Sequence, residues 1–301
     1  MSHSRLPRSV VRLLPLLLFL ILFVGAPVRA ELTVLASIKP LGLIVEEVMG
    51  ERGQVDTLLQ GSASPHNYAM RVSDMQRLQA ADVVVWVGPE METFLVRSLK
   101  RVPAERLIEA QKLPGIGWPE NDAAAHGAHE GHFHQRDPHI WLNPHNGARI
   151  AEAVAKRLGE LDPEGREYYR RNAVELNERL LDLDRELRER LQPLSGLGFA
   201  VYHEGYRHFV DRYGLTQLGH VTFGPEQRPG ARHLHRLRQS LAQAHCLFLE
   251  PYYDTGLAEE LADDLGLQVG QLDPLGLGSS SYPQLLEAMG QSFLDCLAPK
   301  R

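Results

Sequence analysis

The chain has 301 residues and a formal net charge of -6 at pH 7, and 44% of its residues are hydrophobic. The negative charge argues against nucleic acids and anionic membranes as partners, and the length exceeds one typical core, so two domains are expected. The sequence contains no G-x-S-x-G, P-loop or dinucleotide-binding motif, so the enzyme classes that depend on these motifs have no support.

The first 30 residues have the features of an export signal. Arg5, Arg8 and Arg12 precede the apolar run LLPLLLFLILFV, and small residues lead up to Ala30. The run is shorter than the roughly 20 residues of a membrane-spanning helix. We therefore expect residues 1–30 to be a signal peptide that is cleaved near Ala30. Removing its four arginines gives the mature chain a formal charge of -10, and we expect that chain to lie outside the cytoplasm and not in a membrane.

Short β-rich runs alternate with helical patterns in two parts of the mature chain. The first part contains LTVLAS, QVDTLL and DVVVWVG, and the second contains FAVYH, QLGHVTF, CLFLE and QVGQLD. Each run is followed by a helical pattern, which is typical of βα units in a parallel sheet. The sequence therefore predicts two small parallel-sheet α/β lobes, an N-terminal lobe over residues 31–162 and a C-terminal lobe over residues 193–301.

A long helix is predicted between the lobes, over residues 163–192. Its leucines recur at intervals of three and four, the period of one helical stripe. These leucines are Leu176, Leu180, Leu183, Leu187 and Leu191. A helix of this length, roughly 43 Å, is rigid and argues against a wide flexible hinge.

Six histidines fall within residues 126–145, in HGAHEGHFHQRDPHIWLNPH. Residues 114–136 are of low complexity, and we expect a mobile surface loop that is rich in histidine over about 121–136. This loop is predicted to hold metal ions weakly through His126, His129, His132 and His134. After Asp137 the sequence continues as an apolar, strand-like segment.

Three histidines outside the predicted loop follow predicted strands or begin an apolar segment. His66 lies in GSASPHNY, His139 in DPHIWLNP, and His203 at the end of FAVYH. Ligands of α/β sheets bind beyond the carboxyl ends of the strands. The three side chains could therefore meet between the lobes, as a site for a metal such as Zn²⁺.

The remaining histidines of the mature chain have no such placement and are read as structural or surface residues. They are His145, His208, His220, His233, His235 and His245. The run HEGYRH at 203–208 resembles the zinc protease motif HExxH, but its histidines are five residues apart and do not share a helix face. Cys246 and Cys296 are the two cysteines of the chain, and in an exported protein they are expected to form a disulfide worth about 4 kcal/mol.

Several long stretches resemble the cluster A-I periplasmic substrate-binding proteins of metal ABC importers, and in particular their zinc branch. The stretches are GSASPHNYAMRVSDMQRLQAADVVVWVGPEMETFL, DPHIWLNP, FAVYHEGYRHFVDRYGL, GPEQRPGARHLHRLR, LEP and QLDPLG, and the resemblance covers nearly all of residues 31–301. It implies a metal held between two lobes by His66, His139 and His203, and a periplasmic protein whose partner is an inner-membrane ABC permease. The disulfide and the histidine-rich loop also match the zinc branch.

One position departs from the family pattern. Some zinc-branch members have an acid immediately before the first histidine, but this chain has Pro65, which cannot coordinate a metal. Asp273 in QLDPLG matches the acid that completes the site in the manganese branch. The fourth ligand is therefore expected to be Asp273 or a water molecule.

The resulting interpretation is a monomeric zinc-binding transport protein that is not an enzyme. A zinc-dependent hydrolase is the alternative from another class, and it would need a bound water of lowered pKa and a nearby general base. A manganese- or iron-binding protein of the same fold is a further alternative. Imidazole ligands favour zinc, because manganese prefers oxygen ligands.

Overall fold

The computed structural model describes residues 31–61, 63–119, 136–224 and 227–298. The predicted signal peptide and the loop histidines His126, His129, His132 and His134 lie outside these residues. Within the described part of the chain, no helix combines the length and the apolar character that crossing a membrane requires.

A four-stranded parallel sheet in the order β2-β1-β3-β4 organises the first lobe. Its strands are β1 (Leu32–Ala36), β2 (Gly53–Thr57), β3 (Val83–Trp86) and β4 (Leu107–Glu109). Its helices are α1 (Lys39–Met49), α2 (Val72–Ala80) and α3 (Thr93–Leu99). Every residue of β3 is buried, as expected of the apolar, β-branched strand at the middle of a parallel sheet that is covered on both faces.

The second lobe repeats the same arrangement with the strand order β6-β5-β7-β8. Its strands are β5 (Gly198–His203), β6 (Thr216–Thr222), β7 (Ala244–Leu249) and β8 (Gln268–Gln271). Its helices are α6 (Arg207–Tyr213), α7 (Ala231–Ser240), α8 (Gly256–Leu265) and α9 (Tyr282–Leu297). The prediction of two parallel-sheet α/β lobes is confirmed.

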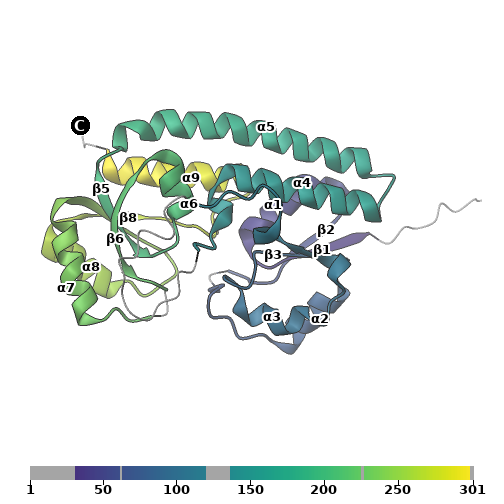
Figure 1. The fold of residues 1–301 in the computed structure, drawn as a ribbon, viewed down its shortest axis with the longest axis horizontal. Coiled ribbons are helices and arrows are strands. Elements are labelled where there is room, and N and C mark those ends of the chain that lie inside the picture. The colour runs from purple at the N-terminus through teal and green to yellow at the C-terminus, as the bar shows by residue number, and fades with distance from the viewer. Residues whose placement is uncertain (1–30, 62, 120–135, 225–226, 299–301) are drawn as a thin grey trace, which may run out of the picture. The chain divides into compact units, whose positions relative to one another are not determined.

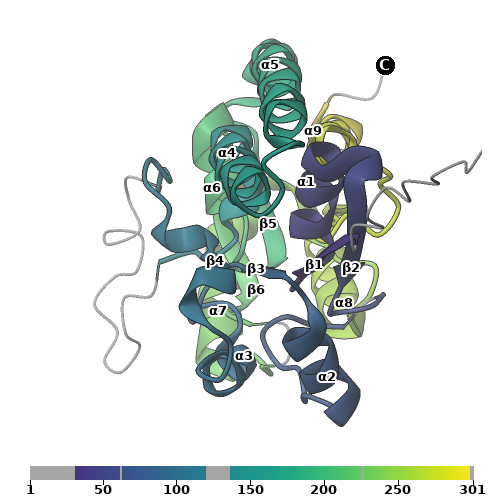
Figure 2. The same ribbon diagram turned by 90° about the vertical axis from the view of Figure 1, so that its right-hand side faces the viewer.

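The predicted connecting helix is α5 (Arg166–Leu191), a helix of 26 residues. It begins at Arg166 and not at Pro163, because Asp162 turns the chain there by accepting hydrogen bonds from Gly165 N. Four of its five stripe leucines are buried, and Leu183 is partly buried. In Figures 1 and 2, α5 lies with α1, α4 (Pro144–Leu161) and α9 on one side of the strands, and α2 and α3 lie on the other side.

The layer of α1, α4, α5 and α9 joins the two lobes through one hydrophobic core. The largest cluster of buried apolar side chains contains Val84 of β3, Ile150 of α4, Leu187 of α5 and Phe248 of β7. A core that is continuous in this way is packed like a crystal and resists bending. The shared packing therefore supports the rigid connection that the leucine stripe predicts, in addition to the helix itself.

Two expectations for residues 136–161 are wrong or incomplete. The apolar segment after His139 is not a strand but a buried 3₁₀ turn, Ile140–Leu142. The flanking prolines at 138 and 144 have no N–H to donate to a sheet ladder, which disfavours a strand here. The second is helix α4, which the sequence did not predict. Outside this segment, the three-residue strand β4 was not predicted either. Asn143 starts α4 by accepting a hydrogen bond from His145 N, as an N-cap residue does.

A buried carboxyl group, Glu92, closes the turn that follows β3. Its Oε2 accepts hydrogen bonds from Val87 N (2.8 Å) and Gly88 N (3.1 Å). Burial raises the pKa of Glu92 to about 7, although these backbone hydrogen bonds oppose the shift. Folding therefore favours the protonated form of this side chain.

We expect Glu92→Gln to remove part of the pH dependence of stability. A carboxyl whose pKa rises on folding destabilises the protein progressively as the pH rises from the unfolded value near 4.5 to about 7, by a total of roughly 3 kcal/mol. Urea unfolding from pH 4.5 to 8 should show the native chain losing stability relative to Glu92→Gln over this window. Parallel stability curves for the two proteins would contradict the expected effect.

Candidate metal site

Each of the three candidate histidines is positioned by a different segment. His66 lies in the loop after β2, and His139 directly precedes the Ile140–Leu142 turn. His203 is the last residue of β5. Their ring centroids lie 5.2 to 5.7 Å apart. Two segments of the first lobe and one strand of the second thus bring three imidazoles together.

The nitrogen atoms of these rings are spaced as a metal ion requires. One ligand atom from each histidine lies within 4.8 Å of the others, and the Nε2 atoms of His139 and His203 are 3.3 Å apart. Two imidazole nitrogens on one tetrahedral zinc, each at about 2.05 Å, are separated by about 3.3 Å. The pair is therefore already at the spacing that a shared zinc ion would impose.

Burial affects the protonation of these rings in different ways. Burial and the neighbouring His139 and His203 lower the pKa of His66 well below 6.5, so its ring is neutral at pH 7. Burial also lowers the pKa of His203, but the charge of Glu250 and a hydrogen bond to it raise that pKa more, and the net shift is upward. Metal binding at His203 must therefore displace a proton when the ring is protonated.

Asp137 is a site residue that the sequence reading did not assign a role. Its Oδ1 accepts a hydrogen bond from His139 N (2.9 Å) and lies 2.7 Å from His139 Nδ1. Its Oδ2 accepts a hydrogen bond from Arg207 N (2.9 Å) at the start of α6. Burial raises the pKa of Asp137, but His139, through its charge and hydrogen bonds, and His208 lower it more, so the carboxylate stays ionised. One side chain thus contacts a candidate ligand and the second lobe.

Glu250 is the corresponding residue beside His203. It follows β7, is 2% exposed, and its Oε1 contacts His203 Nδ1. Glu250 lies in LEP and Asp137 lies in DPHIWLNP, two of the stretches that carry the family resemblance. The family resemblance is therefore the feature of the sequence that could have pointed to both acids.

Asp273, the candidate fourth ligand, is not part of the closely spaced histidine group found among the described residues. Its Oδ2 accepts a hydrogen bond from Leu277 N (2.6 Å), and its Oδ1 is buried without a hydrogen-bond partner in the described part of the chain. The next residue, Pro274, accepts a hydrogen bond from Trp141 Nε1 (2.8 Å), which ties this segment to the one that carries His139. Pro65 is buried beside His66.

Of the six histidines that were read as structural or surface residues, five contact other residues and one is exposed. His208 Nε2 lies 2.9 Å from Asp137 O, and His145 contacts Arg212. His220 Nδ1 lies 2.7 Å from Glu204 Oε2, and His233 Nε2 lies 2.9 Å from His220 O. His235 lies 3.3 Å from Gln239, and His245 is exposed.

The described ends of the predicted loop are packed against the protein. The guanidinium carbon of Arg136 lies over the ring of Trp118, 5.0 Å from the ring centroid. The ring centroids of Trp118 and His208 are 5.7 Å apart. Ile116 also packs against the core. Residues 114–119 do form an irregular surface segment, but Ile116 and Trp118 pack partly against the core, so this part of the predicted loop is anchored to the protein.

Comparison with protein families and curated proteins gives one consistent result. A family model described as zinc-uptake complex component A, periplasmic, matches residues 34–296. The high-affinity zinc uptake system protein ZnuA of Yersinia pestis is 34% identical, over 89% of this chain and 92% of that protein. ZnuA of Haemophilus ducreyi is also 34% identical, over 91% of this chain and 96% of that protein.

Solved structures share the same fold. A crystal structure of a ZnuA deletion mutant with zinc bound matches with a TM-score of 0.77 and 29% identity, over 90% of this chain and all of that one. A further crystal structure of ZnuA matches with a TM-score of 0.76 and 28% identity, over 89% of this chain and all of that one.

Proposed function

Because the chain belongs to the family of periplasmic zinc-uptake complex component A, we propose that it captures Zn²⁺ in the periplasm and delivers it to an ABC permease. His66, His139 and His203 are the proposed ligands, with Asp273 or water as the fourth. The observation that carries this proposal is the 3.3 Å between the Nε2 atoms of His139 and His203. Imidazole ligands suit zinc better than manganese.

The proposal includes the organisation of the chain. Residues 1–30 are the proposed signal peptide, cleaved near Ala30, and the mature protein is a monomer without catalytic activity. The N-terminal lobe spans 31–162, the connector 163–192 and the C-terminal lobe 193–301. Helix α5, Arg166–Leu191, packs against α4 and α9, and it supports a helical connector within residues 163–192.

Metal analysis followed by competition titration tests the proposed function. Protein purified without chelator should carry zinc, and titration against a zinc chelator should show one tight equivalent. Turnover of ester, phosphate or peptide substrates by the zinc-loaded protein would favour the hydrolase alternative. Preference for manganese over zinc would favour the other metal-binding alternative.

A loop deletion is expected to separate weak zinc binding from tight binding. Deleting residues 123–134 removes His126, His129, His132 and His134 and should abolish the additional zinc equivalents while one tight equivalent remains. The loop equivalents should weaken as the pH falls through about 6.5, because imidazole must lose its proton to coordinate. Calorimetric titration of both proteins at neutral and mildly acidic pH measures this, and loss of the tight equivalent would place a loop residue among its ligands.

A further inference from the structure

Two of the three proposed zinc ligands have the same arrangement around their rings. His139 Nδ1 lies 2.7 Å from Asp137 Oδ1, and His203 Nδ1 contacts Glu250 Oε1. An ionised carboxylate only accepts hydrogen bonds, so each Nδ1 must carry its proton. In the neutral ring the lone pair is then on Nε2, and the two Nε2 atoms are the atoms that face each other at 3.3 Å.

The two carboxylates are buried and come from different lobes. Asp137 is 8% exposed and is held in place by hydrogen bonds from His139 N and Arg207 N. Glu250 follows β7, which pairs directly with β5, the strand that ends at His203. Both acceptors are therefore fixed by the fold before any ion arrives.

The charges also balance for one kind of ion. With water as the fourth ligand, three coordinating imidazoles, which must be neutral to bind a metal, and the carboxylates of Asp137 and Glu250 carry a net charge of -2, which a divalent cation neutralises. An unbalanced charge in a buried site is strongly unfavourable. The surroundings of the histidines therefore favour a divalent cation electrostatically.

We propose that Asp137 and Glu250 are positioning residues that fix His139 and His203 in the tautomer that presents Nε2 to zinc and that neutralise the bound ion. In the described part of the chain, no carboxylate forms a hydrogen bond with the ring of His66. The two acids therefore orient two of the proposed ligands and not the third. This inference rests on the proposed function, because it concerns the same metal site.

Glu250 offers the sharper substitutions. Glu250→Gln retains an oxygen for His203 Nδ1 but removes the charge, and Glu250→Leu removes both. We expect zinc affinity to fall by about 10-fold in Glu250→Gln and by about 100-fold in Glu250→Leu, the range seen for partners of metal ligands. Asp137→Asn should also weaken zinc, because its amide cannot accept from both His139 and Arg207.

Glu204→Gln is the matched control. Glu204 is the next residue after His203, but its Oε2 lies 2.7 Å from His220 Nδ1 and accepts from Gln217 Nε2. Glu204→Gln removes the same charge as Glu250→Gln, but from a side chain that does not contact the ring of His203. If the hydrogen bond to the ligand is what matters, zinc affinity should stay within about 3-fold of the native value. An equal loss in Glu204→Gln and Glu250→Gln would overturn the proposal, because net charge alone would then explain both.

The tautomers can be measured directly in the metal-free native protein by long-range ¹H–¹⁵N correlation spectra of labelled histidine. We expect His139 and His203 to be protonated at Nδ1, and His203 to lose this preference in Glu250→Leu while His139 keeps it. A neutral ring protonated at Nε2 in either native histidine would overturn the proposal, whether or not the variants fold. Absence of tight zinc binding by the native chain would instead refute the proposed function.

Discussion

Replacing His66, His139 or His203 with alanine is expected to lower zinc affinity more than about 100-fold in each case. Even the hydrogen-bond partners of metal ligands are worth about 10- to 100-fold, and a ligand itself contributes more. One ligand atom of each ring lies within 4.8 Å of the other two, and no other described histidine belongs to this group, so none is placed to replace a lost ligand. Competition with a zinc chelator measures the loss.

Two controls keep this experiment specific to the metal site. His235→Ala removes an exposed histidine whose ring lies near Gln239 on α7, and it should leave the tight equivalent unchanged. His203→Gln retains a donor for Glu250, which His203→Ala would leave buried without its partner. If His203→Gln melts like the native apo-protein but still fails to bind zinc, loss of the fold is excluded. Unchanged affinity in any alanine variant would remove that residue from the proposed ligands.

Two of the three histidines could be placed from the sequence by topology, and the third by the family resemblance. In a parallel sheet every strand ends at the same edge, so His66 after β2 and His203 at the end of β5 had to lie at the ligand-binding edges of their lobes. His139 lies in the family stretch DPHIWLNP. The chain order of strands and helices carried this information without any side-chain detail.

The parts that the sequence did not yield depend on local competition and side-chain pairing. Asn143-Pro144 can begin a helix or form a turn, and Gly147 close behind lowers helix propensity, so α4 was not predicted. The roles of Asp137 and Glu250 depend on which oxygen meets which ring nitrogen. Nothing in the spacing of acids along the chain encodes that.

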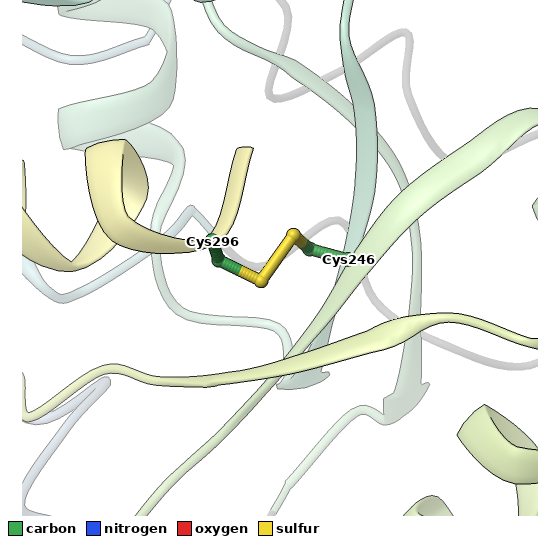
Figure 3. The surroundings of a disulfide bond; sticks show 2 residues. All are labelled: Cys246 and Cys296. Carbon is green, nitrogen blue, oxygen red and sulfur yellow. A yellow bond between two sulfur atoms is a disulfide. The ribbon is translucent and has the colours of Figure 1, made fainter. Parts of the chain in front are cut away.

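Loss of the disulfide is the second large effect that we expect, and it acts on stability. Cys246 in β7 and Cys296 in α9 are joined across a sequence separation of 50 residues, with a Cα–Cα distance of 6.2 Å. Figure 3 shows the bond running from the strand to the helix. Closing a loop of this length restricts the unfolded chain by about 4 kcal/mol in the chain-entropy model.

The double substitution Cys246→Ala/Cys296→Ala should therefore destabilise the protein by about 4 kcal/mol, which corresponds to a melting temperature lower by roughly 8–16 °C for a chain of this size. The two cysteines belong to the same buried core cluster as Phe248 and Phe293, so the substitutions remove some core packing as well. The control is the native protein heated with and without reductant, because reduction removes the covalent link and leaves both cysteine side chains in place.

Non-reducing mass spectrometry should first find a linked peptide and no free thiol in the native chain. Tight zinc binding at 25 °C should persist in the double variant, since Cys246 pairs with Phe199 near the start of β5 and His203 lies at the other end of that strand. A melting temperature that neither reductant nor the substitutions change would show that the disulfide contributes no net stability.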